Sequence, residues 1–114
     1  MSKEILKLKP ENVWKHFYEL TQIPRPTGHT KAVEKYVVDF AKGLNLDVKQ
    51  DKVGNVLITK PASKGMENAP TVILQSHLDM VPQKNSDVQH DFLKDPIETV
   101  IDGNIVKAKS TTLG

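Results

Sequence analysis

The chain has 114 residues, of which 38% are hydrophobic and 26% are charged, with a formal net charge of +2. This length allows one domain with a modest core, and so small a charge favours neither a nucleic-acid nor a membrane partner. Cysteine is absent, which excludes disulfides and thiolate metal sites. Since no apolar run approaches about 18 residues and the N-terminus lacks a signal-like apolar region, we expect a cytoplasmic protein.

Helical spacing of apolar residues dominates the first part of the chain. One helix is predicted to begin at Pro10 and to end shortly before Pro24, because proline disfavours helical geometry in the residue before it. The stretch "IPRPTGHT" is predicted to be a loop. A second helix is expected from about Thr30 to Lys42, with Gly43 as its terminator.

Strand-like patterns follow. The stretch "LDVKQDKVGNVLITK" predicts two short strands around a Gly-Asn turn, and Asp102-Gly103 between β-branched stretches predicts a hairpin. Thr71–Ser76 contains a continuous apolar run, so we expect a strand that is buried on both faces, with Val72, Ile73 and Leu74 in the core. The polar stretch "QKNSDVQHDFLKDP" is expected to be irregular. Together these elements predict an α/β fold.

His77 and Asp79 are the candidate site residues, because they stand where the expected buried strand ends. Ligands of α/β sheets bind at the carboxyl ends of strands. Residues i and i+2 of an extended chain point to the same side, and a carboxylate can orient a metal-binding imidazole. Asp79 could hold His77 directly, act through a turn, or lie on the other side of a metal; a structural hydrogen bond without any metal is the alternative.

The remaining candidates carry weaker signals. His16 falls within a helix, where a surface position is expected, and His29 and His90 fall in loops. Ser76 lacks flanking glycines, so a nucleophile elbow is not indicated. No Gly-rich phosphate loop is present.

Three stretches resemble one known group of enzymes. These are "IPRPTGHT", "VKQDKVGNVLITKPASKGMENAPTVILQSHLDMVPQKN" and "KSTTLG". Together they resemble the aminoacyl-histidine dipeptidases (Xaa-His dipeptidases, peptidase D) of the zinc exopeptidase family. The resemblance implies the N-terminal part of a zinc-exopeptidase-like catalytic domain, in which helices pack on a mixed central sheet.

The resemblance also implies roles for the two candidate residues. His77 would bind one of two zinc ions, and Asp79 would hold the metal-binding histidine without being a ligand. The relatives hydrolyse dipeptides, including those ending in histidine, with a zinc-activated water and a glutamate as general base. A related deacylase or tripeptidase is one alternative, and a non-catalytic α/β binding module is another.

Several functional residues of the family would lie beyond Gly114. These are an aspartate that bridges both metals, the catalytic glutamate, the remaining ligands, and the smaller lid or dimerisation domain. We therefore expect residues 1–114 to be a single partial catalytic domain, inactive by itself and weak in zinc binding. Uncovered sheet edges also predict self-association into a homo-oligomer.

Overall fold

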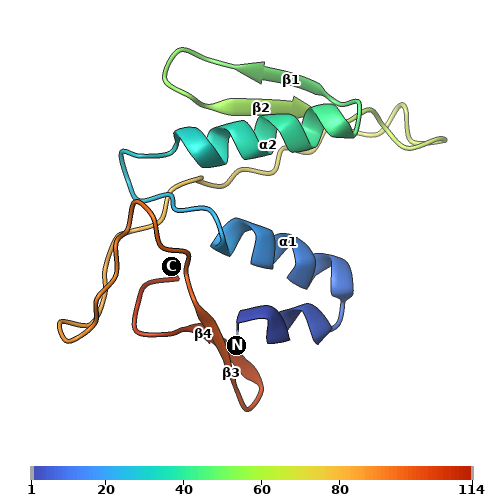
Figure 1. Ribbon diagram of the computed structural model, residues 1–114. Coiled ribbons are helices and arrows are strands. Elements are labelled where there is room, and N and C mark those ends of the chain that lie inside the picture. Colours follow the sequence, from blue (N-terminus) through green and yellow to red (C-terminus); the bar gives the residue numbers. More distant parts are fainter. Residues whose placement is uncertain (1, 114) are drawn as a thin grey trace. The chain divides into compact units, whose positions relative to one another are not determined.

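The computed structural model describes residues 2–113 of the chain (Figure 1). In chain order the elements are η1 (Ser2–Lys7), α1 (Glu11–Thr21), α2 (Lys31–Gly43), β1 (Asp47–Gln50), β2 (Val56–Thr59), β3 (Thr99–Asp102) and β4 (Ile105–Ala108). The chain divides into two compact units. One unit runs to Val33 and resumes at Asp79, and the other spans Glu34–Leu78.

In the first unit, the short 3-10 helix η1 packs against both α1 and β3 (Figure 1). Ile5 of η1 is completely buried, and the Thr99 amide of β3 donates a hydrogen bond to the Ser2 hydroxyl over 3.1 Å. Helix α1 confirms the prediction of a helix between Pro10 and Pro24. Helix η1 was not predicted from the sequence, because a six-residue segment is too short to display a helical period.

The predicted hairpin at Asp102-Gly103 is confirmed. Strands β3 and β4 pair antiparallel, with Asp102 opposite Ile105, so Gly103 and Asn104 form a two-residue turn. Gly103 has φ +60°, which matches the first central position of a type II′ turn. This turn fits the right-handed twist of the two strands, and a side chain at Gly103 would be strained.

In the second unit, α2 is confirmed as a helix, and it ends one residue later than the sequence suggested. Gly43 is the last helical residue, and Asn45 takes the left-handed conformation with φ +57°. The Leu46 amide donates to the Ala41 carbonyl over 3.0 Å, and the Asn45 amide donates to the Lys42 carbonyl over 2.9 Å. This pair of bonds is a Schellman motif, in which Asn45 terminates the helix. The prediction that Gly43 is the terminator was therefore wrong.

The two short strands predicted around the Gly-Asn turn are confirmed as β1 and β2, which pair antiparallel with Asp47 opposite Thr59. The Asp51 side chain organises their turn. Its Oδ1 accepts hydrogen bonds from the amides of Val53, Gly54 and Asn55 at 2.9–3.0 Å. A carboxylate that accepts three backbone N–H groups holds the loop in one conformation.

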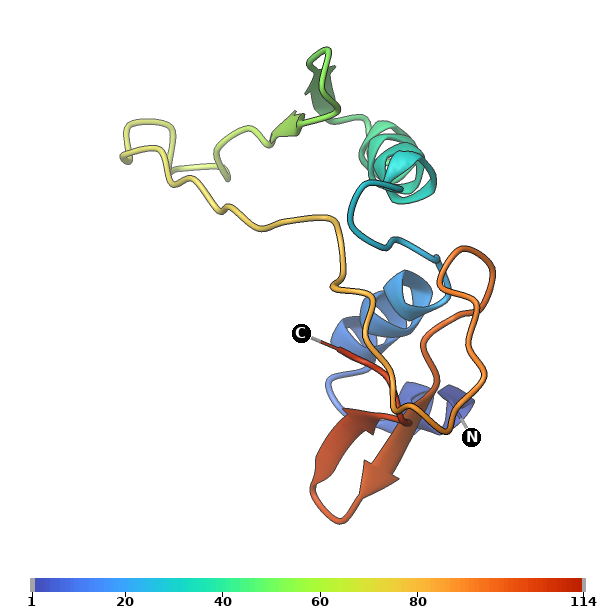
Figure 2. The ribbon, with the colours of Figure 1, turned by 90° about the vertical axis from the view of Figure 1, so that its left-hand side faces the viewer.

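The expected buried strand at Thr71–Ser76 is not formed. This segment is extended, and Figure 2 shows it without a strand arrow. Val72, Ile73 and Leu74 are 79%, 82% and 92% exposed, so the prediction that they lie in the core was wrong. The physical reason is that a strand requires a neighbouring strand, and the strands in residues 2–113 pair with each other as two separate antiparallel hairpins.

The α/β class is confirmed, but its sheet portion in this chain consists of the two hairpins. A mixed central sheet is not formed by residues 2–113. Within the same range, no helix has both the length and the apolar character that crossing a membrane would require.

Candidate functional site

Asp79 is held by a residue that lies 52 positions earlier in the chain. The Thr27 hydroxyl donates a hydrogen bond to Asp79 Oδ2 over 2.6 Å. A hydroxyl donor facing a carboxylate at this distance forms a charge-assisted bond, which is stronger than a bond between neutral groups. The loop "IPRPTGHT" therefore supplies a direct partner for one of the two candidate site residues.

The backbones of the same two segments are also joined. Pro26 and Met80 form an isolated parallel bridge, and the Met80 amide donates to the Arg25 carbonyl over 2.9 Å. Pro26 is buried, and as a proline it has no amide that would need a partner there. The segment that carries Asp79 is thus fixed along the loop by main-chain as well as side-chain bonds.

A tight turn presents Thr27 to Asp79. The His29 amide donates to the Pro26 carbonyl over 2.9 Å, which closes a four-residue turn around Thr27 and Gly28. Gly28 has φ +87°, as the third residue of a type II turn requires. Glycine is therefore needed at this position, and His29 follows the turn as an exposed residue.

Arg25 adds a positive charge near the carboxylate. Burial lowers the pKa of the Arg25 guanidinium from its ordinary value, and the nearby negative charge of Asp79 opposes this by raising the pKa. The guanidinium stays protonated in proteins. A partly buried cation stabilises the ionised form of a neighbouring carboxyl group, so Arg25 favours Asp79 as a carboxylate.

His77 lies in the other compact unit, whose last residue is Leu78. Its side chain is exposed, whereas that of Asp79 is half-buried. An imidazole in contact with solvent can accept a metal ion, which a ring enclosed in the apolar core could not do. The position of His77 is therefore compatible with the predicted role of a ligand, and that role stays a prediction.

Metal ligands do not converge in the part of the chain that the structure covers. Among residues 2–113, no group of three or more His, Cys, Asp or Glu side chains could hold an ion. Catalytic zinc is held by three protein ligands and structural zinc by four. Residues 2–113 therefore do not make up a zinc site by themselves.

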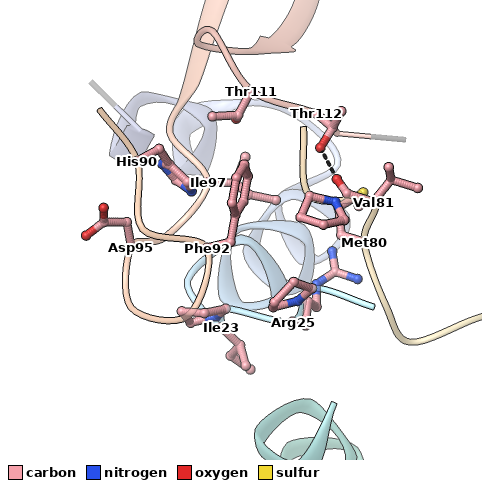
Figure 3. Close-up of a pocket in the computed structure, with 13 residues that line it drawn as sticks. Ile23, Arg25, Met80, Val81, His90, Phe92, Asp95, Ile97, Thr111 and Thr112 are labelled. Carbon is pink, nitrogen blue, oxygen red and sulfur yellow. Dashed lines mark hydrogen bonds between the residues drawn. The ribbon is translucent and has the colours of Figure 1, made fainter. Parts of the chain in front are cut away.

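A small cavity in the first unit lies among the segments that carry the site. Side chains from four stretches line it, including Arg25, Met80, Phe92 and Thr112 (Figure 3). Its volume of about 20 Å³ is close to that of a single water molecule. Pockets for small molecules measure roughly 300–1,000 Å³, so this cavity is not a substrate pocket.

Residues 110–112 are hydrogen-bonded to the segment that follows Asp79. The Thr112 hydroxyl donates to the Val81 carbonyl (Figure 3), and the Thr112 amide donates to the Gln83 carbonyl over 3.0 Å. The Asn85 amide donates to the Ser110 carbonyl over 2.9 Å. The first unit thus brings together parts of all three stretches on which the family resemblance rests.

The sequence pattern indicates Asp79 as a site residue but does not indicate Thr27 or Arg25. Both lie in the stretch "PRPTG". Its prolines and glycine predict a loop, but they do not indicate a functional role for either residue. Their contact with Asp79 depends on how the chain returns 52 residues later, which no local pattern encodes.

Comparison with known proteins confirms the resemblance. The chain is 51% identical over 111 residues to the cytosol non-specific dipeptidase of Escherichia coli (strain K12), covering 97% of this chain and 23% of that protein. The structure of this chain matches the crystal structure of aminoacylhistidine dipeptidase from Vibrio alginolyticus with a TM-score of 0.93 and 49% identity. That match covers 100% of this chain and 24% of the other. No family model matches the chain.

The chain therefore spans about a quarter of the length of the dipeptidases that it matches. This agrees with the expected resemblance to the N-terminal portion of such proteins. With 49% identity and a TM-score of 0.93 over the whole chain, this chain and the matching part of the Vibrio alginolyticus dipeptidase share one fold.

Proposed function

We propose that the gene product containing this chain is a cytoplasmic metallo-dipeptidase, which hydrolyses dipeptides such as Xaa-His, and that this chain is a part of its catalytic domain. One observation carries the proposal: the 51% identity to a cytosol dipeptidase extends over 97% of the chain. The structural match to an aminoacylhistidine dipeptidase supports the same activity.

In this proposal, His77 supplies one imidazole ligand to zinc, and Asp79 orients that part of the site. The exposed position of His77 and the fixed position of Asp79 support these roles. The further ligands of two zinc ions, and the general base, would come from other parts of the gene product. Residues 1–114 alone are therefore expected to be inactive as a dipeptidase and to bind zinc weakly.

The test is an assay of the whole gene product with β-Ala-His and Gly-His, before and after treatment with a chelator. We expect hydrolysis that the chelator abolishes and that added zinc restores. Full activity in metal-free protein would overturn the proposal. N-acyl amino acids and tripeptides in the same assay identify a deacylase or tripeptidase if they are hydrolysed faster than the dipeptides.

Replacement of the two site residues tests their roles separately. His77→Ala should abolish hydrolysis and lower the zinc content, with little change in the free energy of unfolding, because an exposed side chain contributes little packing. Asp79→Ala should lower hydrolysis strongly while zinc stays partly bound. Wild-type turnover in either variant would contradict the assigned role.

A further inference from the structure

Two kinds of bond join the loop that carries Thr27 to the segment that carries Asp79. Mutation can remove one kind and leave the other in place. The backbone bridge from Pro26 to Met80, with the bond between the Met80 amide and the Arg25 carbonyl, places the segment that carries Asp79. The Thr27 hydroxyl bonds to the carboxylate itself, at 2.6 Å. The first set fixes where the main chain lies, and the second fixes which way the carboxylate points.

We propose that Thr27 is a positioning residue of the enzyme, whose hydroxyl holds the Asp79 carboxylate in the orientation that the reaction requires. This inference rests on the proposed dipeptidase function. Thr27 itself does not touch substrate in this scheme; it acts through Asp79.

The local structure is suited to such a role. Asp79 is half-buried, and its other neighbour of known charge is the partly buried guanidinium of Arg25. A carboxylate side chain has two rotatable bonds, so directed hydrogen bonds are what hold its oxygens in one orientation. The Thr27 hydroxyl, which a type II turn places, bonds to one oxygen, Oδ2, and so restricts the orientation of the group.

The turn also explains why the hydroxyl is a precise donor. Gly28 and the bond from the His29 amide to the Pro26 carbonyl set the direction of the Thr27 side chain. Threonine is branched at Cβ and has restricted χ1 rotamers, so its hydroxyl is held with little freedom. Serine would keep the donor with more freedom, and valine would keep the shape but lose the donor.

The experiment compares Thr27→Val and Thr27→Ser with wild type in the whole gene product. Thr59→Val is the matched control, because Thr59 is an exposed β-strand threonine in β2 with the same change of hydroxyl to methyl. The measurements are kcat and KM for Gly-His, the thermal unfolding midpoint, and the hydrogen-exchange rate of the Met80 amide.

For Thr27→Val we expect kcat to fall by about 10–100-fold, the range typical of partners that orient a metal-site residue, with KM nearly unchanged. The unfolding midpoint and the Met80 exchange rate should stay close to wild type, because the backbone bridge remains. Thr27→Ser should recover most of the lost kcat, and Thr59→Val should match wild type.

The outcomes separate this inference from the proposed function. Absence of turnover in wild type refutes the dipeptidase proposal and, with it, the positioning role of Thr27. Active wild type with an equally active Thr27→Val variant refutes the positioning role alone. A lower unfolding midpoint and faster Met80 exchange in Thr27→Val, with kcat per folded molecule unchanged, assign Thr27 a purely structural role and also overturn the inference.

Discussion

The carboxylate of Glu34 occupies the space that a side chain at Gly54 would need. A Cβ placed on Gly54 would lie 2.8 Å from Glu34 Cδ and 3.1 Å from Glu34 Oε2. Glu34 is only 5% exposed, and its Oε2 accepts a hydrogen bond from Gln50 Nε2 over 3.3 Å. Gln50 also donates to the Gly54 carbonyl over 3.4 Å. The turn between β1 and β2 is thus joined to α2 through one buried acid.

Gly54→Ala is therefore expected to destabilise the second unit. Gly54 has φ +102°, where an L-residue is strained, and the methyl group would displace Glu34 from its bond to Gln50. The strain predicts a loss of about 1–3 kcal/mol in the free energy of unfolding, measured by denaturant titration.

Gly43→Ala is the control for this substitution. Gly43 is the last residue of α2, and nothing lies within 4 Å of a Cβ added there. Since alanine favours helix more than glycine does, this variant should gain up to about 1 kcal/mol. Equal effects of the two alanines would show that Glu34 does not restrict Gly54.

The end of α2 gives a second prediction, at Asn45. Asn45 has φ +57° in the Schellman motif. After glycine, asparagine is one of the residues that adopt this left-handed conformation most readily. Asn45→Ala should lower the free energy of unfolding by about 1 kcal/mol, and Asn45→Gly should leave it unchanged or raise it slightly. Thermal unfolding of both variants tests this, and a neutral Asn45→Ala would argue against Asn45 as the terminator.

Local sequence signals predicted most of the helices and hairpins. The helical stripes before Pro24 and the glycine of the β3–β4 turn act over a few residues, so they can be seen in the sequence itself. Gly43 and Asn45 are both suitable residues for ending a helix, and they lie two positions apart. Which of them terminates α2 depends on where the last helical turn stops. The register of a helix end is set partly by packing and is poorly predicted from sequence.

Non-local features were predicted less well. The pattern of Thr71–Ser76 indicates a buried strand, yet burial requires a partner that residues 2–113 do not supply. For the site, the spacing of His77 and Asp79 predicted both candidates, but not the Thr27 hydroxyl that bonds to Asp79. Its contribution follows from the return of the chain to a distant loop.

The Asp51 carboxylate predicts a dependence of stability on pH. Its pKa lies below the ordinary value of 3.8, chiefly because the Asn55 side chain donates to it and further because backbone amides do so. A depressed folded-state pKa stabilises the fold above the unfolded pKa, and this contribution is lost as the pH falls through the folded pKa. Acidification below about pH 4 should therefore loosen the turn between β1 and β2.

Asp51→Asn removes this titration. At pH 7 the variant should unfold at a lower temperature than wild type, and the difference should shrink as the pH is lowered toward 3. Asp87→Asn, at an exposed loop position, controls for the loss of one negative charge. A difference in unfolding temperature that stays constant from pH 7 to pH 3 would show that the ionised Asp51 carboxylate does not stabilise the turn.

The exposed apolar segment Val72–Leu74 predicts self-association of the 114-residue chain. The segment consists of three consecutive exposed aliphatic residues in an extended stretch that belongs to neither sheet. It therefore offers apolar side chains together with a main chain that could pair with another strand. We expect sedimentation velocity to detect dimers or larger species whose share grows with concentration. Alanine at any of the three positions should cost little folding stability, because these side chains are 79–92% exposed.

A lysine substitution distinguishes association through this segment from non-specific hydrophobic association. Val72 and Val53 are both 79% exposed, but Val53 lies in the Asp51 turn, where its amide already has a partner. Val72→Lys should shift the chain toward monomer, because a charge on an exposed edge disfavours pairing with another strand. Val53→Lys removes the same apolar area and should leave association unchanged. If both variants lower association equally, surface hydrophobicity rather than the strand-like edge drives it, and a monomeric wild-type chain at high concentration rules out association altogether.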